Sequence, residues 1–276
     1  MEESNMTKKK VAMVVGAMAL SAVMAVGGTL AYLQATTATK ANVFTSSNNI
    51  TPELKEEQWD KTGKQEASNY KPGDVIAKDP TISIKAGSEA GYVAISLNYL
   101  KDLTNTEEAT MAGTSITKTE FLNYATPAPN YAAGWTLIAK NANGSELYMY
   151  GTALAPTTTD VSAPAIFTNV TVQAGITTVT TTSTSTHYTR TYKTDGTFDS
   201  TVVDPTKITT NTSYYDAAGN VCALNSLPSF GIKATGYAVQ ANVNGEALTT
   251  AAAAAQLIAL ANAGITDSAA LYTAVQ

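Results

Sequence analysis

The sequence is poor in the residues that build disulfide frameworks and metal centres. Its 276 residues include one cysteine, Cys222, and one histidine, His187. A single cysteine excludes an internal disulfide framework and a Cys-rich metal centre. A single histidine excludes multi-histidine metal centres such as the H-E-x-x-H motif. We therefore predict no catalytic, cofactor-binding or metal-binding residues, and no cofactor.

Charge is scarce as well. Charged residues make up 14% of the chain, against roughly 25% in typical soluble domains. The net charge is −5 and the pI about 4.9, so the electrostatic footprint of a nucleic-acid-binding protein is missing. Threonine and alanine are abundant in place of the missing charged residues. Abundant β-branched polar residues at low net charge argue against disorder and favour strands.

A long apolar run occurs at the N-terminus. Lys8, Lys9 and Lys10 precede an uncharged stretch over 11–26, and small residues follow it. This layout predicts a secretory signal peptide over 1–31, cleaved between Ala31 and Tyr32. A retained membrane anchor is the alternative, because the run approaches the roughly 18 residues of a spanning helix. We expect a secreted product at the cell surface or in the extracellular matrix, without a membrane anchor after processing.

The segment 32–44 predicts one weak strand. Small and polar residues alternate in it, and side chains of a strand point to opposite faces in turn. One face would carry Ala35, Thr37, Thr39, Ala41 and Val43.

The domain expected over 45–276 is mainly β. Strand patterns cover 75–76, 81–84, 92–99, 134–139, 146–150, 165–172 and 230–240. An Asn-Gly turn at Asn143 predicts a hairpin, whereas 45–71 predicts an exposed loop or short helix and 101–128 an excursion with a short helix near 118–124. Together they predict an antiparallel β-sandwich with a few peripheral helices.

Two regions depart from this pattern. Residues 175–215 are rich in threonine and serine, and an Asp-Gly turn at Asp195 predicts a protruding β-ribbon; a disordered tract is the alternative. Residues 246–275 are rich in alanine and predict helices. The first is expected over 246–263 and the second over 268–275, with Asp267 as its N-cap.

Five segments resemble, in order, the TasA and camelysin (CalY) group of secreted proteins. They are G-G-T-L-A-Y-L-Q-A-T-T-A-T-K-A-N-V-F-T (27–45), the K-P-G-D turn with its strands (70–99), the Trp hairpin (134–154), A-P-A-I-F-T-N-V-T-V (163–172) and G-I-K-A-T-G-Y-A-V-Q-A (231–241). The Thr-rich block 175–215 departs from the group and is expected to be an insertion.

The resemblance implies a jelly-roll domain exported through a signal peptidase of the SipW type. It also implies a biofilm-matrix fibre, in which copies of the chain are each other's partners. The N-terminal segment of one subunit adds as a strand to the next, and 32–44 fits that donor role. An edge strand of its own domain, or a flexible start, is the alternative interpretation of this segment.

Two other functions stay open. The camelysin branch is classed with metallopeptidases, but catalytic zinc usually takes three protein ligands. Here His187 stands alone, and Asp195, Asp199 and Asp204 lack ligand spacing. Asp74 and Asp79 could bind calcium through their oxygens, although no EF-hand loop is present. A monomeric surface adhesin, binding through the Thr-rich ribbon, is the third possibility.

Overall fold

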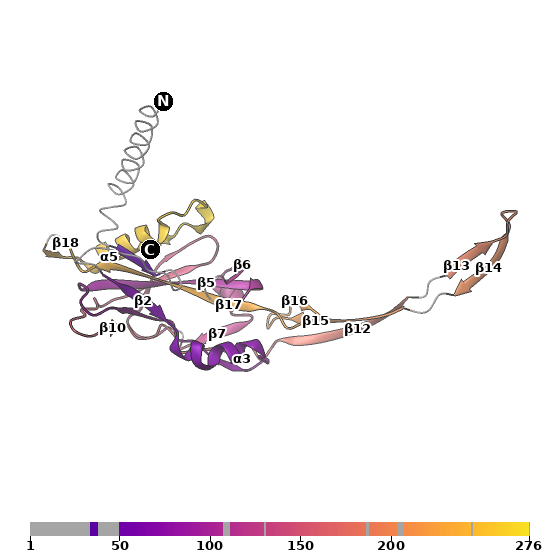
Figure 1. Ribbon diagram of the computed structural model, residues 1–276, viewed down its shortest axis with the longest axis horizontal. Coiled ribbons are helices and arrows are strands. Elements are labelled where there is room, and N and C mark those ends of the chain that lie inside the picture. The colour runs from indigo at the N-terminus through magenta and orange to yellow at the C-terminus, as the bar shows by residue number, and fades with distance from the viewer. Residues whose placement is uncertain are drawn as a thin grey trace, which may run out of the picture.

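The computed structural model describes residues 34–37, 50–106, 111–129, 131–185, 188–203, 207–243 and 245–275. Figure 1 shows a β-sheet body and a thin arm that projects far from one end of it. The fold is mainly β and its sheets are antiparallel, which confirms the predicted class. The jelly-roll topology stays a prediction. The signal-peptide prediction lies outside the described residues.

The body is built around one large sheet, called the main sheet below. Its strand order is β1-β17-β5-β9-β8-β20, and β6 also pairs with β5. The bounds are β1 (Gln34–Thr37), β5 (Gly91–Asn105), β6 (Ala112–Ile116), β8 (Trp135–Lys140), β9 (Glu146–Tyr150), β17 (Phe230–Gln240) and β20 (Thr273–Ala274).

Strand β5 is buried on both faces. Its odd-numbered side chains, among them Ile95 and Tyr99, belong to the large core cluster, while Ala94 belongs to a second cluster on the opposite face. A strand covered on both sides needs a nearly continuous apolar run, and residues 92–100 supply it. This explains why the sequence pattern of β5 alternates only weakly.

Two smaller sheets cover one face of the main sheet. One has the order β10-β4-β2, with β2 (Pro52–Lys55), β4 (Thr81–Ile84) and β10 (Val161–Ser162); the other has the order β3-β11-β7, with β3 (Val75–Ala77), β7 (Ala125–Ala128) and β11 (Asn169–Val172). Ile82, Ile84 and Val170 from these sheets enter the same core cluster as β5. The body is therefore a β-sandwich.

Helix α5 (Thr250–Asn262) covers the other face of the main sheet (Figure 1). Alanine is the strongest helix former, and the Thr249 hydroxyl accepts a hydrogen bond from the Ala252 N–H at the helix start. Ala253, Leu257 and Ala261, spaced by four, face Leu147 and Met149 of β9. The described chain thus forms three layers: small sheets, main sheet and helix.

The arm is the ribbon predicted over 175–215. Strand β12 (Thr177–Ser185) pairs with β15 (Lys207–Tyr215) through nine residue pairs, and β16 (Val221–Leu224) joins β15 at the base. A hairpin of β13 (Tyr188–Tyr192) and β14 (Phe198–Val203) forms the far end, with Gly196 at φ 82° in its turn. The ordered ribbon replaces the alternative of a disordered tract.

Several local predictions need correction. The polar stretch 101–128 is not an excursion alone, because β5 runs on to Asn105 and β6 and β7 follow; the predicted short helix is α4 (Lys118–Phe121). Strand 165–172 is restricted to β11, since Ile166 and Phe167 enter the core from a bend. Within 45–71 the described part holds β2 and the helices η1 (Trp59–Gly63) and α3 (Lys64–Ser68).

The C-terminal tail is also shorter in helix than expected. Residues 246–247 form β19 (Glu246–Ala247), which pairs with β18 (Asn242–Val243), and α5 begins only at Thr250. Asp267 does cap a turn, but this is the short η3 (Ser268–Ala270). Strand β20 then takes the chain back to β8.

Candidate functional site at the edge of strand β17

Strand β17 lies near one edge of the main sheet and holds the candidate assembly site. On one side it pairs with β5 through eleven consecutive residues, from Phe230 to Gln240. On its other side, the described strand β1 pairs with four residues, Gly236–Val239. Among the described residues, β17 is thus paired along its full length on one side and along four residues on the other.

The register of β1 pairs two of the predicted donor-strand residues with β17. Ala35 lies opposite Ala238, and Thr37 lies opposite Gly236. Ala238 is fully buried in the sandwich core, so the acceptor position opposite Ala35 belongs to the core face of β17.

The remaining predicted site residues lie outside the described part of the chain. They are Thr39, Ala41 and Val43 of the strand, and Ala31 and Tyr32 of the cleavage site. In the single chain, β1 pairs with its own β17, which is the edge-strand arrangement that the sequence left open beside the donor role.

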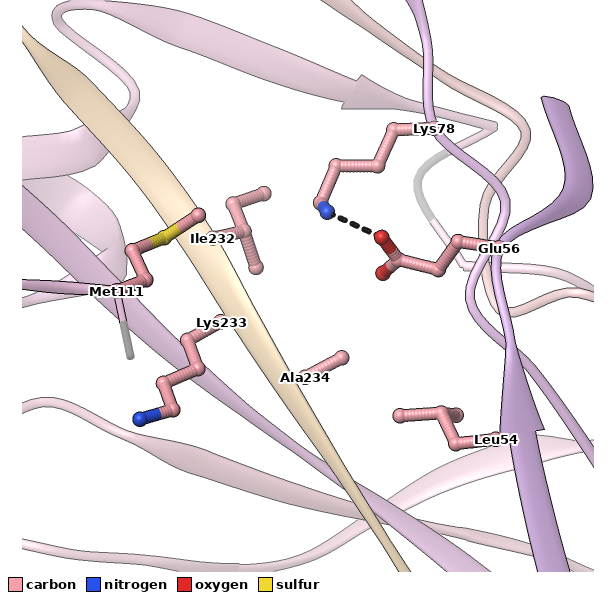
Figure 2. A pocket seen from close by; sticks show the side chains of 7 residues that line it. All are labelled: Leu54, Glu56, Lys78, Met111, Ile232, Lys233 and Ala234. Carbon is pink, nitrogen blue, oxygen red and sulfur yellow. Dashed lines mark hydrogen bonds and ion pairs between the residues drawn. The ribbon is translucent and has the colours of Figure 1, made fainter. Parts of the chain in front are cut away.

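A small pocket lies beside residues 232–234 of β17, which do not pair with the described strand β1. Leu54, at the edge strand β2, contributes to its lining, and so do Ile232 and Ala234 of β17. Figure 2 shows the side chains of Ile232 and Ala234 on the side of β17 that faces Glu56 and Lys78. The gap between the edges of two sheets is thus lined by side chains of both.

The ion pair in this pocket is almost fully buried. Lys78 Nζ lies 2.7 Å from Glu56 Oε2, and the two side chains are 6% and 3% exposed. The ammonium also lies 4.4 Å from the centre of the Trp59 ring. The desolvation cost of burying both ions is about as large as the free energy of their attraction. Removing one partner, however, leaves the other as an unpaired buried charge. No sequence motif indicates this pair, because its members are 22 residues apart.

A second buried carboxylate, Glu146, lies on the main sheet. Its Oε2 accepts hydrogen bonds from Tyr148 at 2.7 Å and Tyr99 at 3.1 Å, and its Oε1 lies 2.9 Å from Lys140 Nζ. The Tyr99 hydroxyl also lies 2.8 Å from that of Tyr131. The alternation of Glu146 and Tyr148 in β9 was the sequence signal for this cluster.

The protonation of the cluster follows from its surroundings. Burial alone raises the pKa of Glu146, but the hydrogen bonds from Lys140 and Tyr148 and the nearby positive charges outweigh it and hold the pKa below its ordinary value. Burial raises the pKa of Tyr99 and of Tyr148. Both hydroxyls therefore stay protonated and donate to an ionised carboxylate.

Neither buried carboxylate resembles a catalytic zinc site. Across the described ranges, no group of three or more His, Cys, Asp or Glu gathers, and a peptidase zinc takes three protein ligands with imidazole prominent among them. Glu56 and Glu146 are each engaged by a lysine. The described donors do not fit the metal; His187 and Asp204 lie outside the described residues.

Asp74 and Asp79, the two candidate calcium ligands, have structural roles. Asp79 Oδ1 accepts the Gln58 and Trp59 N–H groups at the start of η1, and Asp74 Oδ2 accepts the Lys71 N–H. Cys222 is half-buried against the core, and its Sγ lies 3.4 Å from the Tyr214 carbonyl oxygen. Burial raises the pKa of this thiol.

Comparison with known families gives one match. Residues 6–142 match the family model described as camelysin metallo-endopeptidase. Over this N-terminal half, the chain belongs to the camelysin family. No curated protein and no solved structure matches significantly. In the described ranges, no helix has the length and apolar character to cross a membrane.

Camelysin membership places the chain in a family of secreted and surface proteins. It agrees with the resemblance found in the sequence. The match ends in the hairpin β8–β9, so the arm, β17 and α5 follow the matched region. The matched camelysin segment contains β1, and the unmatched half contains the strand on which β1 lies.

Proposed function

We propose that this protein is an extracellular structural subunit that assembles head-to-tail. The N-terminal strand of one copy would lie on β17 of the next copy. The observation that carries this proposal is the β1–β17 pairing, in which a short N-terminal strand lies along β17 and sets Ala35 opposite the core residue Ala238. Strand addition of this kind gains affinity from main-chain hydrogen bonds.

The same register, carried further along β17, extends the contact. It would set Thr39 opposite Ala234, Ala41 opposite Ile232 and Val43 opposite Phe230. Ile232 and Ala234 are buried residues that line the pocket. The small donor side chains fit beside the Glu56–Lys78 pair, where a bulky or charged donor residue would need to be desolvated.

The geometry of such a contact favours filaments. Donor strand and acceptor edge are different surfaces of one chain, so the contact is heterologous and propagates unless the rotation closes a ring. Export through a signal peptidase of the SipW type, as the resemblance implies, would expose the N-terminal strand outside the cell. The resemblance to the TasA group supports the biofilm matrix as the place of such filaments.

Electron microscopy of the chain that starts at Tyr32 tests the proposal. We expect filaments, and we expect them to disappear when 32–44 is deleted. Undiminished filaments after the deletion would contradict the donor role.

A matched pair of point variants sharpens the test. Ala41→Glu places a charge on the face toward Ile232 and should abolish filaments. Lys40→Glu places the same charge on the other face, next to Lys233, and should leave them intact. Equal effects of the two variants would contradict the proposed register.

The family description favours a second candidate, a secreted metallo-endopeptidase. Degradation of casein by the purified protein, with and without a chelator, tests it. We expect no chelator-sensitive turnover, because the described residues do not assemble a three-ligand site. Clear turnover that a chelator abolishes would overturn this expectation.

A further inference from the structure

The outer edge of strand β12 is the longest open strand edge of the arm. β12 pairs with β15 along nine residues on one side, and no described strand pairs with its other side. In an antiparallel ladder, alternate residues direct their N–H and C=O groups away from the partner. The outer edge of β12 therefore presents a row of backbone donors and acceptors.

The outer edge of β15 is partly occupied in comparison. β16 pairs with it over Ser213–Tyr215. Next to that pairing, the Asn225 side-chain oxygen accepts the Thr212 N–H at 2.8 Å, and the Asn225 N–H donates to the Thr212 carbonyl at 2.7 Å. β12 is therefore the better edge for an incoming strand.

Strand β12 lacks the features that usually keep edges apart. Proteins protect edge strands with charges, proline, bulges or short length. The sequence T-T-V-T-T-T-S-T-S contains no charge, proline or glycine, and its pairing runs without a register shift. The edge strand β2 of the body, in contrast, carries Glu53 and Lys55, whose charged groups lie 3.0 Å apart.

The side chains of β12 suit a strand like itself. Its even-numbered face is entirely threonine: Thr178, Thr180, Thr182 and Thr184. Thr–Thr hydroxyl contacts already join β12 to β15, at 3.1 Å for Thr180–Thr212 and 3.3 Å for Thr182–Thr210. Cross-strand Thr pairs stabilise sheets, and a neutral edge meets a second neutral edge without repulsion.

We propose that β12 is a homotypic docking edge. β12 of one copy would pair antiparallel with β12 of a second copy and merge the two arms into one sheet. The contact is isologous, since the same edge is used on both sides. It is separate from the β1–β17 contact, and would join neighbouring filaments sideways.

Cysteine cross-linking of the chain that starts at Tyr32 tests the docking edge. In a Cys222→Ser background, single cysteines replace Thr178, Thr180, Thr181, Thr182 and Thr184 in turn. Paired Cα atoms lie within disulfide range, so the position nearest the two-fold axis should form covalent dimers at least about tenfold faster than a cysteine on the body surface. Thr158→Cys, exposed on the body, is the matched control. Dimer formation no faster than this control would overturn the proposal.

Charges introduced on β12 distinguish specific strand pairing from non-specific association. With the cysteine at position 178, 181 or 184, the double variant Thr180→Lys with Thr182→Lys should reduce cross-linking about tenfold, as should the corresponding Glu pair, because like charges then face each other. A mixture of the Lys and Glu variants should restore it. Lysines at Thr157 and Thr159 of the body should have no effect. Unchanged cross-linking in the Lys pair, or no rescue in the mixture, would overturn the proposal. Filaments that form without this cross-link would leave head-to-tail assembly standing, so the two failures are distinguishable.

Discussion

Strands β5 and β12 are both regularly paired, but they differ in what they cover. β5 buries side chains on both faces, between the small sheets and α5. All nine residues of β12 are exposed. A ribbon without a core is held by its ladder and by its anchorage to the body. The body thus folds around its own core, whereas the arm contributes exposed surface and no core.

The anchorage of the arm supports this distinction. Ile176 packs on Ile76 and Val172 just before β12 begins, and the Ala217 N–H donates to the Asn123 carbonyl. Cys222 of β16 also packs against the core at the base, and the described part of the arm farther out projects away from the body (Figure 1). Its exposed apolar residues, such as Val179 and Ile208 at 49% and 66% exposure, contribute little to folding and remain available for association.

The largest expected contrast comes from one substitution made in both regions. Phe121 is 1% exposed in the body core and Phe198 is 55% exposed in the arm. Phe121→Ala should reduce the free energy of unfolding by about 3–5 kcal/mol because it leaves a cavity. Phe198→Ala should change it by less than about 1 kcal/mol. Urea unfolding followed by circular dichroism measures both. Similar losses would show that the arm folds as part of the core.

The buried ion pair should behave as a property of the body. Glu56→Gln leaves the buried Lys78 ammonium without its carboxylate and should cost roughly 3–5 kcal/mol. The double variant with Lys78→Met should recover most of that loss, because no buried charge remains. A double-mutant cycle by urea unfolding measures the coupling. If the double variant were as unstable as the single one, the pocket would depend on the charges themselves.

Glu146 should connect body stability to pH. Its pKa is lowered in the folded state, so its contribution is complete above the unfolded value near 4.5 and is lost as the pH falls through the folded value. Glu146→Gln should therefore cost about 1–3 kcal/mol at pH 7, and less at pH 3. Urea titrations at both pH values test this. An equal loss at the two values would contradict the assigned pKa direction.

Shortening the arm should have the smallest effect on folding. Replacing 180–212 with Asn-Gly keeps the pairs from Thr177–Tyr215 to Val179–Ser213 and closes them with a favourable hairpin turn. We expect the free energy of unfolding to change by less than about 1 kcal/mol. A larger loss would show that the distal ribbon stabilises the body.

The sequence predicted strands best where the pattern was local. The hairpin of β8 and β9, the ribbon and β17 were all indicated by alternation and by turn residues. Gly144 illustrates why: its φ is 89°, and an added Cβ would lie 2.5 Å from the Ile116 carbonyl oxygen. Only glycine fits there, so the Asn-Gly signal was specific.

The features set by tertiary packing were not predictable. β6 reads as polar because four of its five residues are exposed and it holds its place by pairing with β5. The Glu56–Lys78 pair joins separate segments and has no motif. For the proposed assembly site, alternation predicts a small-residue face over 35–43, and this stays a prediction. The acceptor was not predicted, because pairing between residues about 200 apart leaves no local pattern.

Mixing two cysteine variants tests head-to-tail assembly most directly. In a Cys222→Ser background, one chain starting at Tyr32 carries Ala35→Cys and another carries Ala238→Cys, the two positions that face each other in the β1–β17 register. Neither variant alone has both thiols of this contact. If β1 adds to a neighbouring copy, mild oxidation of the mixture should give a disulfide-linked heterodimer that neither variant forms alone. If β1 stays on its own chain, the mixture will give no heterodimer, and the assembly account is contradicted.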